Sequence, residues 1–251
     1  MILFIAVMIA LTVAGIIFVL GPRMAEGRVI YRTEPDAPAA FGYQMAWLAV
    51  RTRDTRLVLE ALELEAYEPC NWNSGIGTVY DARLGESRVY VSPPVNGWTF
   101  VVGLPLPHPV GRGYADKLTP LLVSLGGRFV EVQYFFAYPP LDMYAWARML
   151  DGRLVRAFAA SDEGVLWSKG KTTKEERTLG LKLFELRGVK GRAGDAGGAL
   201  MLHPTEDHVM RLAHRWSLDP AKLDGQPVSR TAGYIAVAPR AWRLERLARA
   251  A

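Results

Sequence analysis

The first 20 residues form one uninterrupted apolar run, and this run most constrains how the chain can fold. Residues 1–20 carry no charged side chain, and only Thr12 and Gly15 fall outside the apolar set. As an α-helix the run would be about 30 Å long, which matches the hydrocarbon thickness of a bilayer. The sequence therefore predicts a transmembrane anchor within residues 1–22, with the rest of the chain attached to it.

A cleaved signal peptide is the alternative interpretation of this run. Such a leader has a basic start, a shorter apolar core of about 7–15 residues and a cleavage site made of small residues. No Lys or Arg precedes the run, and residues 21–26 (Gly-Pro-Arg-Met-Ala-Glu) make a poor cleavage sequence. The pattern favours a retained anchor, and cleavage of residues 1–22 remains the open alternative.

Basic residues after the run set its expected orientation. Arg23, Arg28 and Arg32 follow it closely, whereas its other side has only the α-amino group. Because Lys and Arg near a membrane helix are retained on the cytoplasmic side, we expect a single-pass protein with a cytoplasmic globular part.

Composition indicates one folded domain after the anchor. Hydrophobic residues make up 50% of the chain and aromatic residues 10%, which is far from a disordered segment. The single cysteine, Cys70, leaves no internal disulfide and agrees with a reducing compartment. A net charge of +5 is too small to argue for nucleic acid as a partner.

The segments after the anchor differ in their patterns. Residues 23–40 hold two prolines, with a third at Pro22 just before them, and lack a sustained apolar period, and this predicts a juxtamembrane linker. Residues 41–239 alternate strand and helix patterns and form the expected globular domain. Residues 240–251 place leucines on one side of a helical wheel and arginines on the other, which predicts a basic amphipathic C-terminal helix.

Turn signals make the globular domain a largely antiparallel sheet. Asn96-Gly97 and Asp151-Gly152 each join two apolar runs, as two-residue hairpin turns do. Residues 44–52 are apolar on both faces, which suits a central strand, and residues 68–85 are expected to be irregular. Apolar periodicity and capping residues predict helices after Asp54, within residues 114–125, after Thr173 and across residues 205–216. The expected fold class is α+β, with helices packed on the sheet.

Three of the four histidines lie close together and suggest a metal site. His203, His208 and His214 fall within twelve residues of one another. The last two are six residues apart and therefore lie on different faces of a helix, whereas a helical zinc pair is separated by four residues. We therefore predict no metal and no cofactor.

Cys70 and His108 are the weak catalytic candidates. Both lie in proline-flanked, loop-like stretches that the fold could bring together as nucleophile and base. A lone cysteine is more often a packing residue. No other pattern of paired carboxylates, serine triad or nucleotide loop supports an enzyme.

Aromatic side chains are the other notable feature. The set comprises Trp72, Tyr80, Tyr90, Trp98, Trp146 and Trp167. Some must belong to the core, and others could line a recognition groove. The residues predicted to bind a partner are Asn71, Trp72, Asn73, Trp98 and Arg148.

These patterns favour a membrane-anchored, non-enzymatic binding protein, for example an inhibitory or immunity-type protein that captures a protein partner. Membrane lipid is the second expected partner, met by the anchor and by Arg243, Arg246 and Arg249 of the C-terminal helix. The alternative hypothesis is a membrane-tethered hydrolase or transferase that uses Cys70 or His108.

The topology can be tested with a C-terminal reporter that works only in the cytoplasm. The reporter should be active, and the full-length chain should need detergent for extraction, because the apolar run is retained in the bilayer. A soluble chain that starts near residue 25, or a reporter active only outside, would contradict this topology.

Overall fold

The computed structural model describes residues 29–111, 113–162, 164–181, 204–227 and 229–247. From Arg32 onward the chain forms one compact unit, and the residues before Arg32 group separately. The anchor predicted within residues 1–22 lies outside the described residues. Among the helices that are described, none combines the length and the apolar character needed to cross a bilayer.

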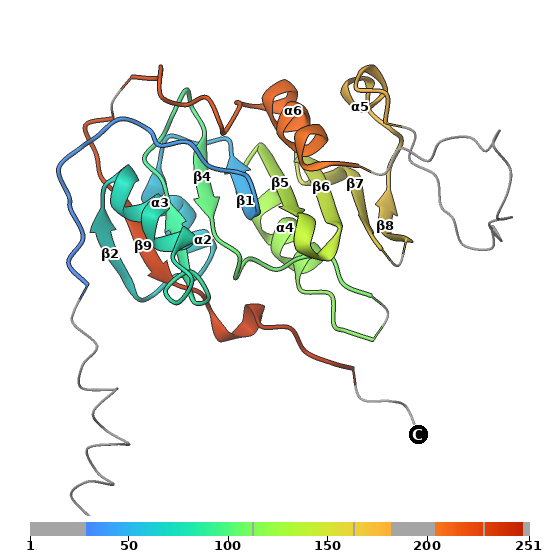
Figure 1. The fold of residues 1–251 in the computed structure, drawn as a ribbon, viewed down its shortest axis with the longest axis horizontal. Helices are drawn as coiled ribbons and strands as arrows, with labels where there is room; N and C mark the ends of the chain where they lie inside the picture. Colours follow the sequence, from blue (N-terminus) through green and yellow to red (C-terminus); the bar gives the residue numbers. More distant parts are fainter. Residues whose placement is uncertain (1–28, 112, 163, 182–203, 228, 248–251) are drawn as a thin grey trace, which may run out of the picture. The chain divides into compact units, whose positions relative to one another are not determined.

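Nine strands of the described chain form a single sheet in which every neighbouring pair is antiparallel (Figure 1). Their order across the sheet is β2-β9-β3-β4-β1-β5-β6-β7-β8. The strands are β1 (Met45–Val50), β2 (Tyr67–Cys70), β3 (Arg88–Val91), β4 (Thr99–Val102), β5 (Glu131–Tyr138), β6 (Met143–Leu150), β7 (Arg153–Ser161), β8 (Gly164–Lys169) and β9 (Gly233–Val237). The prediction of a largely antiparallel sheet that carries helices is confirmed.

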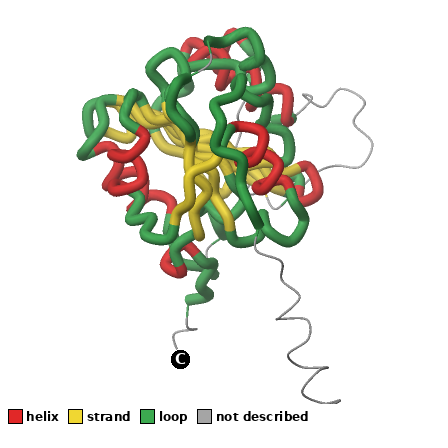
Figure 2. Tube along the Cα trace, turned by 90° about the vertical axis from the view of Figure 1, so that its left-hand side faces the viewer, coloured by secondary structure: helices red, strands yellow, loops and turns green. Residues whose placement is uncertain are grey.

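Helices cover both faces of this sheet (Figure 2). The helical elements are α2 (Thr55–Ala61), α3 (Trp72–Tyr80), α4 (Leu118–Gly126), α5 (Lys174–Thr178), α6 (Glu206–Trp216) and the 3-10 turns η1 (Pro139–Leu141) and η2 (Arg240–Trp242). The helices α2 and α4 join a largely aliphatic core on one face, which we call the α2/α4 face. The helices α3 and α6 pack on the other, the α3/α6 face, mainly through aromatic rings.

Strand β1 is buried on both faces, as its sequence predicts. All six of its residues are buried. Leu48 belongs to the core of the α2/α4 face, whereas Trp47 stacks on Phe135 of β5 under α6, with 5.1 Å between ring centroids. Each large apolar side chain buried in this way contributes roughly 1.5–3 kcal/mol, so both helix layers are needed to cover the strand.

Both predicted hairpin turns have the expected backbone. Asn96 and Gly97 adopt φ angles of 49° and 81°, and Asp151 and Gly152 adopt 47° and 74°. Positive φ at both central residues gives the twist that joins adjacent antiparallel strands without splaying them. The hairpins β3-β4 and β6-β7 are therefore set by short-range sequence signals.

The stretch predicted to be irregular, residues 68–85, contains the helix α3 and most of β2 instead. Two side chains cap the start of α3. Asp36 accepts hydrogen bonds from the backbone N–H groups of Trp72 and Asn73 at 2.8 and 2.9 Å. Asn71 accepts a further bond from the first turn at 3.0 Å. One of the two caps thus comes from a distant part of the chain, where no local pattern reveals it.

Gly75 lets α3 lie very close to β3. A Cβ atom at this position would be only 2.2 Å from the ring of Tyr90. Trp72, one turn earlier, packs edge-on against the same ring with 5.4 Å between centroids. The glycine lowers intrinsic helix propensity, but it permits this contact between the helix and the sheet.

The predicted linker, residues 23–40, is part of the domain from Arg32 onward. The Arg32 carbonyl accepts a hydrogen bond from the Asn71 backbone N–H at 2.7 Å. The Asn71 side chain donates to the Glu34 carbonyl at 3.1 Å. Residues 32–36 therefore bind along the start of α3, and the domain boundary lies earlier than the sequence predicted.

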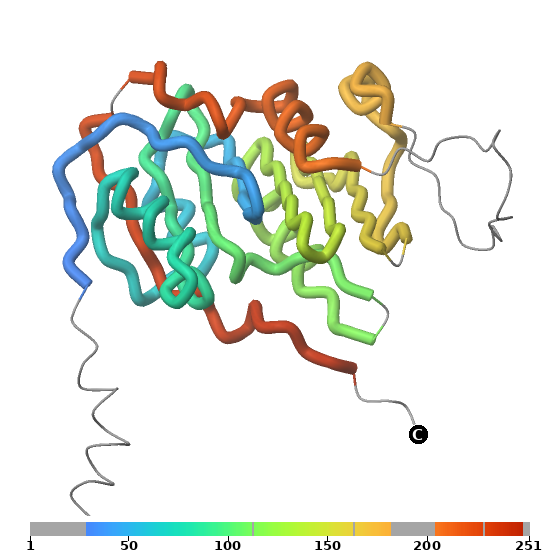
Figure 3. The backbone as a smooth tube through the Cα atoms, in the orientation of Figure 1, coloured from blue at the N-terminus to red at the C-terminus, as the bar shows by residue number. Residues whose placement is uncertain are grey.

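The predicted C-terminal helix over residues 240–251 is wrong for its described part. After the single turn η2, residues 243–247 are extended, and we call them the C-terminal strap. The Glu245 carbonyl accepts from the Ala115 N–H at 2.9 Å, and the Leu247 N–H donates to the same loop at 3.0 Å (Figure 3). The backbone hydrogen bonds that a helix would keep within itself go to another segment instead.

A buried ion pair holds the short helix α5. The Arg156 guanidinium of β7 and the Glu176 carboxylate are 2.8 Å apart, and both side chains are almost completely buried. The Trp146 indole N–H donates to the same carboxylate at 2.9 Å. The sequence offers two possible capping boxes here, Thr172 with Glu175 and Thr173 with Glu176, and the second is the one that forms. One carboxylate therefore both caps α5 and fixes it to the sheet.

Replacing either turn glycine by a β-branched residue should destabilise the fold. We expect Gly97→Val and Gly152→Val each to cost more than about 1 kcal/mol, because both sites require positive φ. Denaturant unfolding followed by tryptophan fluorescence measures this loss.

Gly77→Ala is the matched control, because residue 77 lies within α3 with no atom within 4 Å of its Cβ position. It should raise stability by about 0.5–1 kcal/mol. Unchanged stability of both valine variants would show that the two turns are wrongly placed.

Candidate functional site

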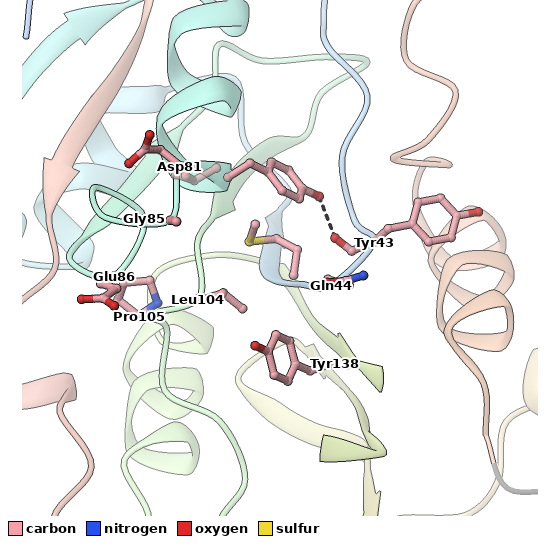
Figure 4. Close-up of a pocket in the computed structure, with 12 residues that line it drawn as sticks. Tyr43, Gln44, Asp81, Gly85, Glu86, Leu104, Pro105 and Tyr138 are labelled. Atoms are coloured by element: carbon pink, nitrogen blue, oxygen red, sulfur yellow. Dashed lines mark hydrogen bonds between the residues drawn. The ribbon is translucent and has the colours of Figure 1, made fainter. Parts of the chain in front are cut away.

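A hollow of about 740 Å³ opens at the end of the sheet where β1 begins (Figure 4). Its walls come from the residues that enter β1, the end of α3, the loop after α3, the loop after β4 and the last residue of β5. We call it the Tyr80 hollow. The strands β4, β1 and β5 are neighbours, so their ends and the connecting loops meet at this point.

The Tyr80 hydroxyl fixes one wall of the hollow. It accepts a hydrogen bond from the Gly42 N–H at 3.1 Å and donates to the Tyr43 carbonyl at 2.8 Å. Burial raises the pKa of the Tyr80 phenol to about 12, so the group is neutral near neutral pH. The hydroxyl holds the chain that leads into β1 rather than serving as an acid or base.

The hollow combines an apolar lining with an acidic rim. Met45, which is 1% exposed, is the most deeply buried of its apolar lining residues, and Leu104 and Tyr138 also line it (Figure 4). Asp81 and Glu86 lie on the flank away from Tyr43, and their carboxylates point outward from the middle of the hollow (Figure 4). No Lys or Arg is among the residues that line the hollow.

Backbone hydrogen bonds keep one rim carboxylate charged. The N–H groups of Leu84 and Arg83 donate to Asp81 at 2.8 and 2.9 Å, and they lower the pKa of that carboxyl. A carboxylate that accepts such bonds stays ionised to lower pH than a free one. The negative charge on the rim is therefore present throughout the physiological range.

Gln44 provides an adaptable polar group at the opposite flank. Its backbone has a φ angle of 50°, and its N–H donates to the Glu206 carboxylate of α6 at 2.6 Å. Its side-chain amide has no hydrogen-bond partner among the described residues. The hollow can thus accept an apolar group with a hydrogen-bonding or cationic neighbour, and it contains no nucleophile beside a base.

Three of the predicted binding residues have partners within the domain. Trp72 is 1% exposed, and Asn71 is occupied by residues 32–36 and by the first turn of α3. The Asn73 side-chain amide donates to Asp36 at 2.8 Å. None of these residues lines the Tyr80 hollow.

The other two predicted binding residues are also engaged. Trp98 is 3% exposed, and the Arg51 guanidinium lies over its ring at 5.0 Å. Arg148 pairs with Glu131 at 2.8 Å and lies over the Trp216 ring at 5.5 Å. Neither Trp98 nor Arg148 lines the Tyr80 hollow. Recognition of a partner at these two positions stays a prediction.

The two catalytic candidates lie on opposite faces of the sheet. Cys70 is fully buried and pairs with Gly233, whose Cβ position faces the Tyr90 ring on the α3/α6 face. His108 packs against Phe136, a residue of the α2/α4 core, with 5.5 Å between ring centroids. The fold does not bring this thiol and imidazole together.

The remaining predicted residues fall at scattered positions. Arg243 and Arg246 are exposed on the C-terminal strap, whereas Arg249 and His203 lie outside the described residues. His208 accepts from the Thr205 N–H at 3.1 Å and so caps α6. Within the described ranges, no group of three or more His, Cys, Asp or Glu side chains is placed to hold a metal ion.

Sequence reasoning included Tyr80 in its aromatic set but did not find the hollow. The lining comes from five separate segments, and each contributes one to four residues. The only local signal was an aromatic residue just before Asp81 at the end of an unrecognised helix. The site could be found only after the strand order was known.

Comparison of the chain with protein-family models, with curated proteins and with solved structures found no match.

Cys70 should not react with a thiol reagent in the folded protein. The side chain is fully buried, and burial raises the pKa of its thiol to about 12, so almost no thiolate forms at mildly alkaline pH. Ellman's reagent should detect one thiol per chain only after denaturation.

An exposed thiol provides the control for this measurement. Leu141→Cys places a second cysteine at a position that is 62% exposed, and it should react at once in the folded state. Rapid reaction of the native Cys70 would contradict the buried assignment and revive the nucleophile hypothesis.

Proposed function

We propose that this chain is a membrane-anchored, non-enzymatic binding protein that captures a protein partner through the Tyr80 hollow. The observation that carries the proposal is a hollow lined by apolar side chains, with Asp81 and Glu86 at its outer edge and no Lys or Arg among its lining residues. Such a site fits an apolar side chain that neighbours a Lys or Arg in the partner.

Exposed aromatic side chains beside the hollow support a protein partner. Tyr43 is 46% exposed and Tyr80 is 43% exposed. Tyrosine is enriched at protein interfaces because its ring buries apolar area while its hydroxyl keeps a polar contact. An inhibitory or immunity-type role follows if the captured segment belongs to the working surface of the partner.

An acidic site on a basic chain also favours selective capture. The whole chain carries a net charge of +5, so an anionic rim is a local departure from its overall charge. Complementary charge steers association and excludes like-charged partners. Basic partners are then drawn to this site rather than to the rest of the surface.

A hydrolase or transferase that uses Cys70 or His108 is the weaker alternative. The buried thiol has a raised pKa, and burial lowers the pKa of the His108 imidazole. A neutral imidazole can act as a base. The only nucleophile that the sequence analysis proposes is Cys70, and this thiol lies on the opposite face of the sheet.

Selection of displayed random peptides on the full-length chain in detergent tests the proposal. Enriched peptides should place an apolar residue next to Lys or Arg. Leu104→Asp puts a charge on the apolar lining of the hollow and should weaken binding at least about tenfold, because an ionised group must then be desolvated. Asp81→Asn and Glu86→Gln should weaken binding about threefold each and reduce its salt dependence.

The control variant is Leu57→Asp on α2, since Leu57 is 37% exposed and Leu104 is 36% exposed. The two changes are chemically identical, but Leu57 lies away from the hollow. Peptides that bind Leu104→Asp and Leu57→Asp equally, or that lack basic residues, would refute capture at this site.

A further inference from the structure

A second hollow, of about 590 Å³, opens where the chain leaves β1, at the end of that strand away from the Tyr80 hollow. Its lining comes from two segments, the chain that joins β1 to α2 and the chain that leads into β9. We call it the Arg56 hollow. Its lining residues are Thr52, Arg53, Asp54, Thr55, Arg56, Thr231, Ala232 and Tyr234. Its volume is typical of sites that bind small molecules.

Two arginines give this hollow a positive lining, whereas no Lys or Arg lines the Tyr80 hollow. Arg53 is exposed and has no hydrogen-bond or ion-pair partner among the described residues. Arg56 is also exposed, and its guanidinium donates a hydrogen bond to the Tyr234 hydroxyl, which raises the pKa of Arg56. The hollow therefore offers one arginine that is held in position and one that is available to a ligand.

The one acidic residue of the lining is already engaged by the helix beside it. The Asp54 carboxylate accepts hydrogen bonds from the N–H groups of Arg56 and Leu57 at 3.0 and 3.1 Å, and it caps α2. These backbone donors are thus not offered to a ligand, which must be bound by side chains. The two arginines outnumber the single carboxylate, so the lining keeps a net positive charge.

Hydroxyl groups from both segments supply further hydrogen-bond donors. The Thr52 hydroxyl accepts from the Asp54 N–H at 3.1 Å, and its own proton remains available to a ligand. The Thr231 hydroxyl lies 3.0 Å from the hydroxyl of Ser229, so one of these two also keeps a proton to donate. Donors therefore approach the hollow from both of the segments that line it.

Tyr234 gives the hollow an aromatic side. Its ring is half-buried and packs edge-on against the ring of Tyr67, with 5.3 Å between centroids. Tyr67 is 43% exposed. An aromatic side chain beside cationic groups suits a ligand that carries an anionic group on an apolar body.

We propose that the Arg56 hollow binds the phosphate group of a phosphorylated small molecule. Arg53 and Arg56 bind the phosphate oxygens through their guanidinium groups, and hydroxyl groups from the two segments bind from other directions. A carboxylate has two oxygens in one plane and can be satisfied by a single arginine, whereas a phosphate monoester has three terminal oxygens and accepts donors from several sides. The proposal is independent of partner capture, because the two hollows share no lining residue.

Fluorine NMR with small aromatic probes tests this site in the full-length chain in detergent. The probes are fluorophenyl phosphate and fluorobenzoate, which share a ring and differ in the anionic group. Broadening of the probe signal on titration gives the dissociation constant. Fluorophenyl phosphate should bind at least about tenfold more tightly than fluorobenzoate, because the carboxylate engages fewer of the donors.

Arg53→Gln and Arg56→Gln should each weaken binding of fluorophenyl phosphate about tenfold, because each removes charge-assisted hydrogen bonds. Arg243→Gln is the matched control. It removes the same charge from an exposed arginine of the C-terminal strap, beyond the other end of β9, and should leave binding unchanged. Unfolding midpoints of the three variants should stay close to that of the parent chain, which separates a loss of binding from a loss of folding.

Detergent micelles that contain phosphatidic acid distinguish the source of the phosphate, because this lipid carries the same monoester. Displacement of the probe by such micelles identifies a lipid headgroup as the ligand, and retention of the probe identifies a soluble ester; either result supports the phosphate site. Absence of probe binding at millimolar concentration, or equal affinity for the phosphate and the benzoate, would overturn the proposal. So would Arg53→Gln and Arg56→Gln variants that bind as tightly as the parent chain.

Discussion

A strand that is apolar on both sides must be covered on both sides, and β1 imposes this requirement on the whole domain. Its neighbours β4 and β5 extend the sheet, and α2 with α4 close one face while α3 with α6 close the other. The two cores differ in character. Mostly aliphatic side chains fill the first, although Phe129, Tyr134 and Phe136 belong to it. Trp47, Phe135 and Trp216 form part of an aromatic layer in the second. Larger rings leave fewer ways to pack, so the second layer fixes the position of α6 and, through Phe41, of the chain that enters β1.

Local signals predicted the parts of the fold that local interactions determine. The Asn96-Gly97 turn, the Asp151-Gly152 turn and the Thr173 capping box each need residues only a few positions apart, and each is present. The helix α3 was missed because its sequence contains two glycines, an asparagine and a serine, which are poor helix formers. It is stabilised by a carboxylate from Asp36 and by packing on Tyr90, and neither contact is visible at the level of local periodicity.

The candidate site could be predicted less well than the fold. Polar and aromatic residues near Asn71 have the composition of a recognition surface, but the structure uses them to bind residues 32–36. The helical pattern of residues 240–251 was real in the sequence, yet the described strap forms its hydrogen bonds with the loop before α4. In both cases a segment distant in sequence competes for the same groups. Residue type shows that a side chain can bind something, and the fold decides whether the partner is internal.

The contact between Gly75 and Tyr90 has an evolutionary consequence. A Cβ atom at position 75 would overlap the tyrosine ring. Any larger residue there therefore requires α3 to move away from β3, or a smaller residue in place of Tyr90. Descendants of this chain can therefore vary position 75 only if position 90 also changes or if α3 packs less closely on β3. The exposed Gly77, two residues later on the same helix, has open space around it and can drift freely. Selection would therefore conserve Gly75, whereas Gly77 in the same helix could be replaced without a steric clash.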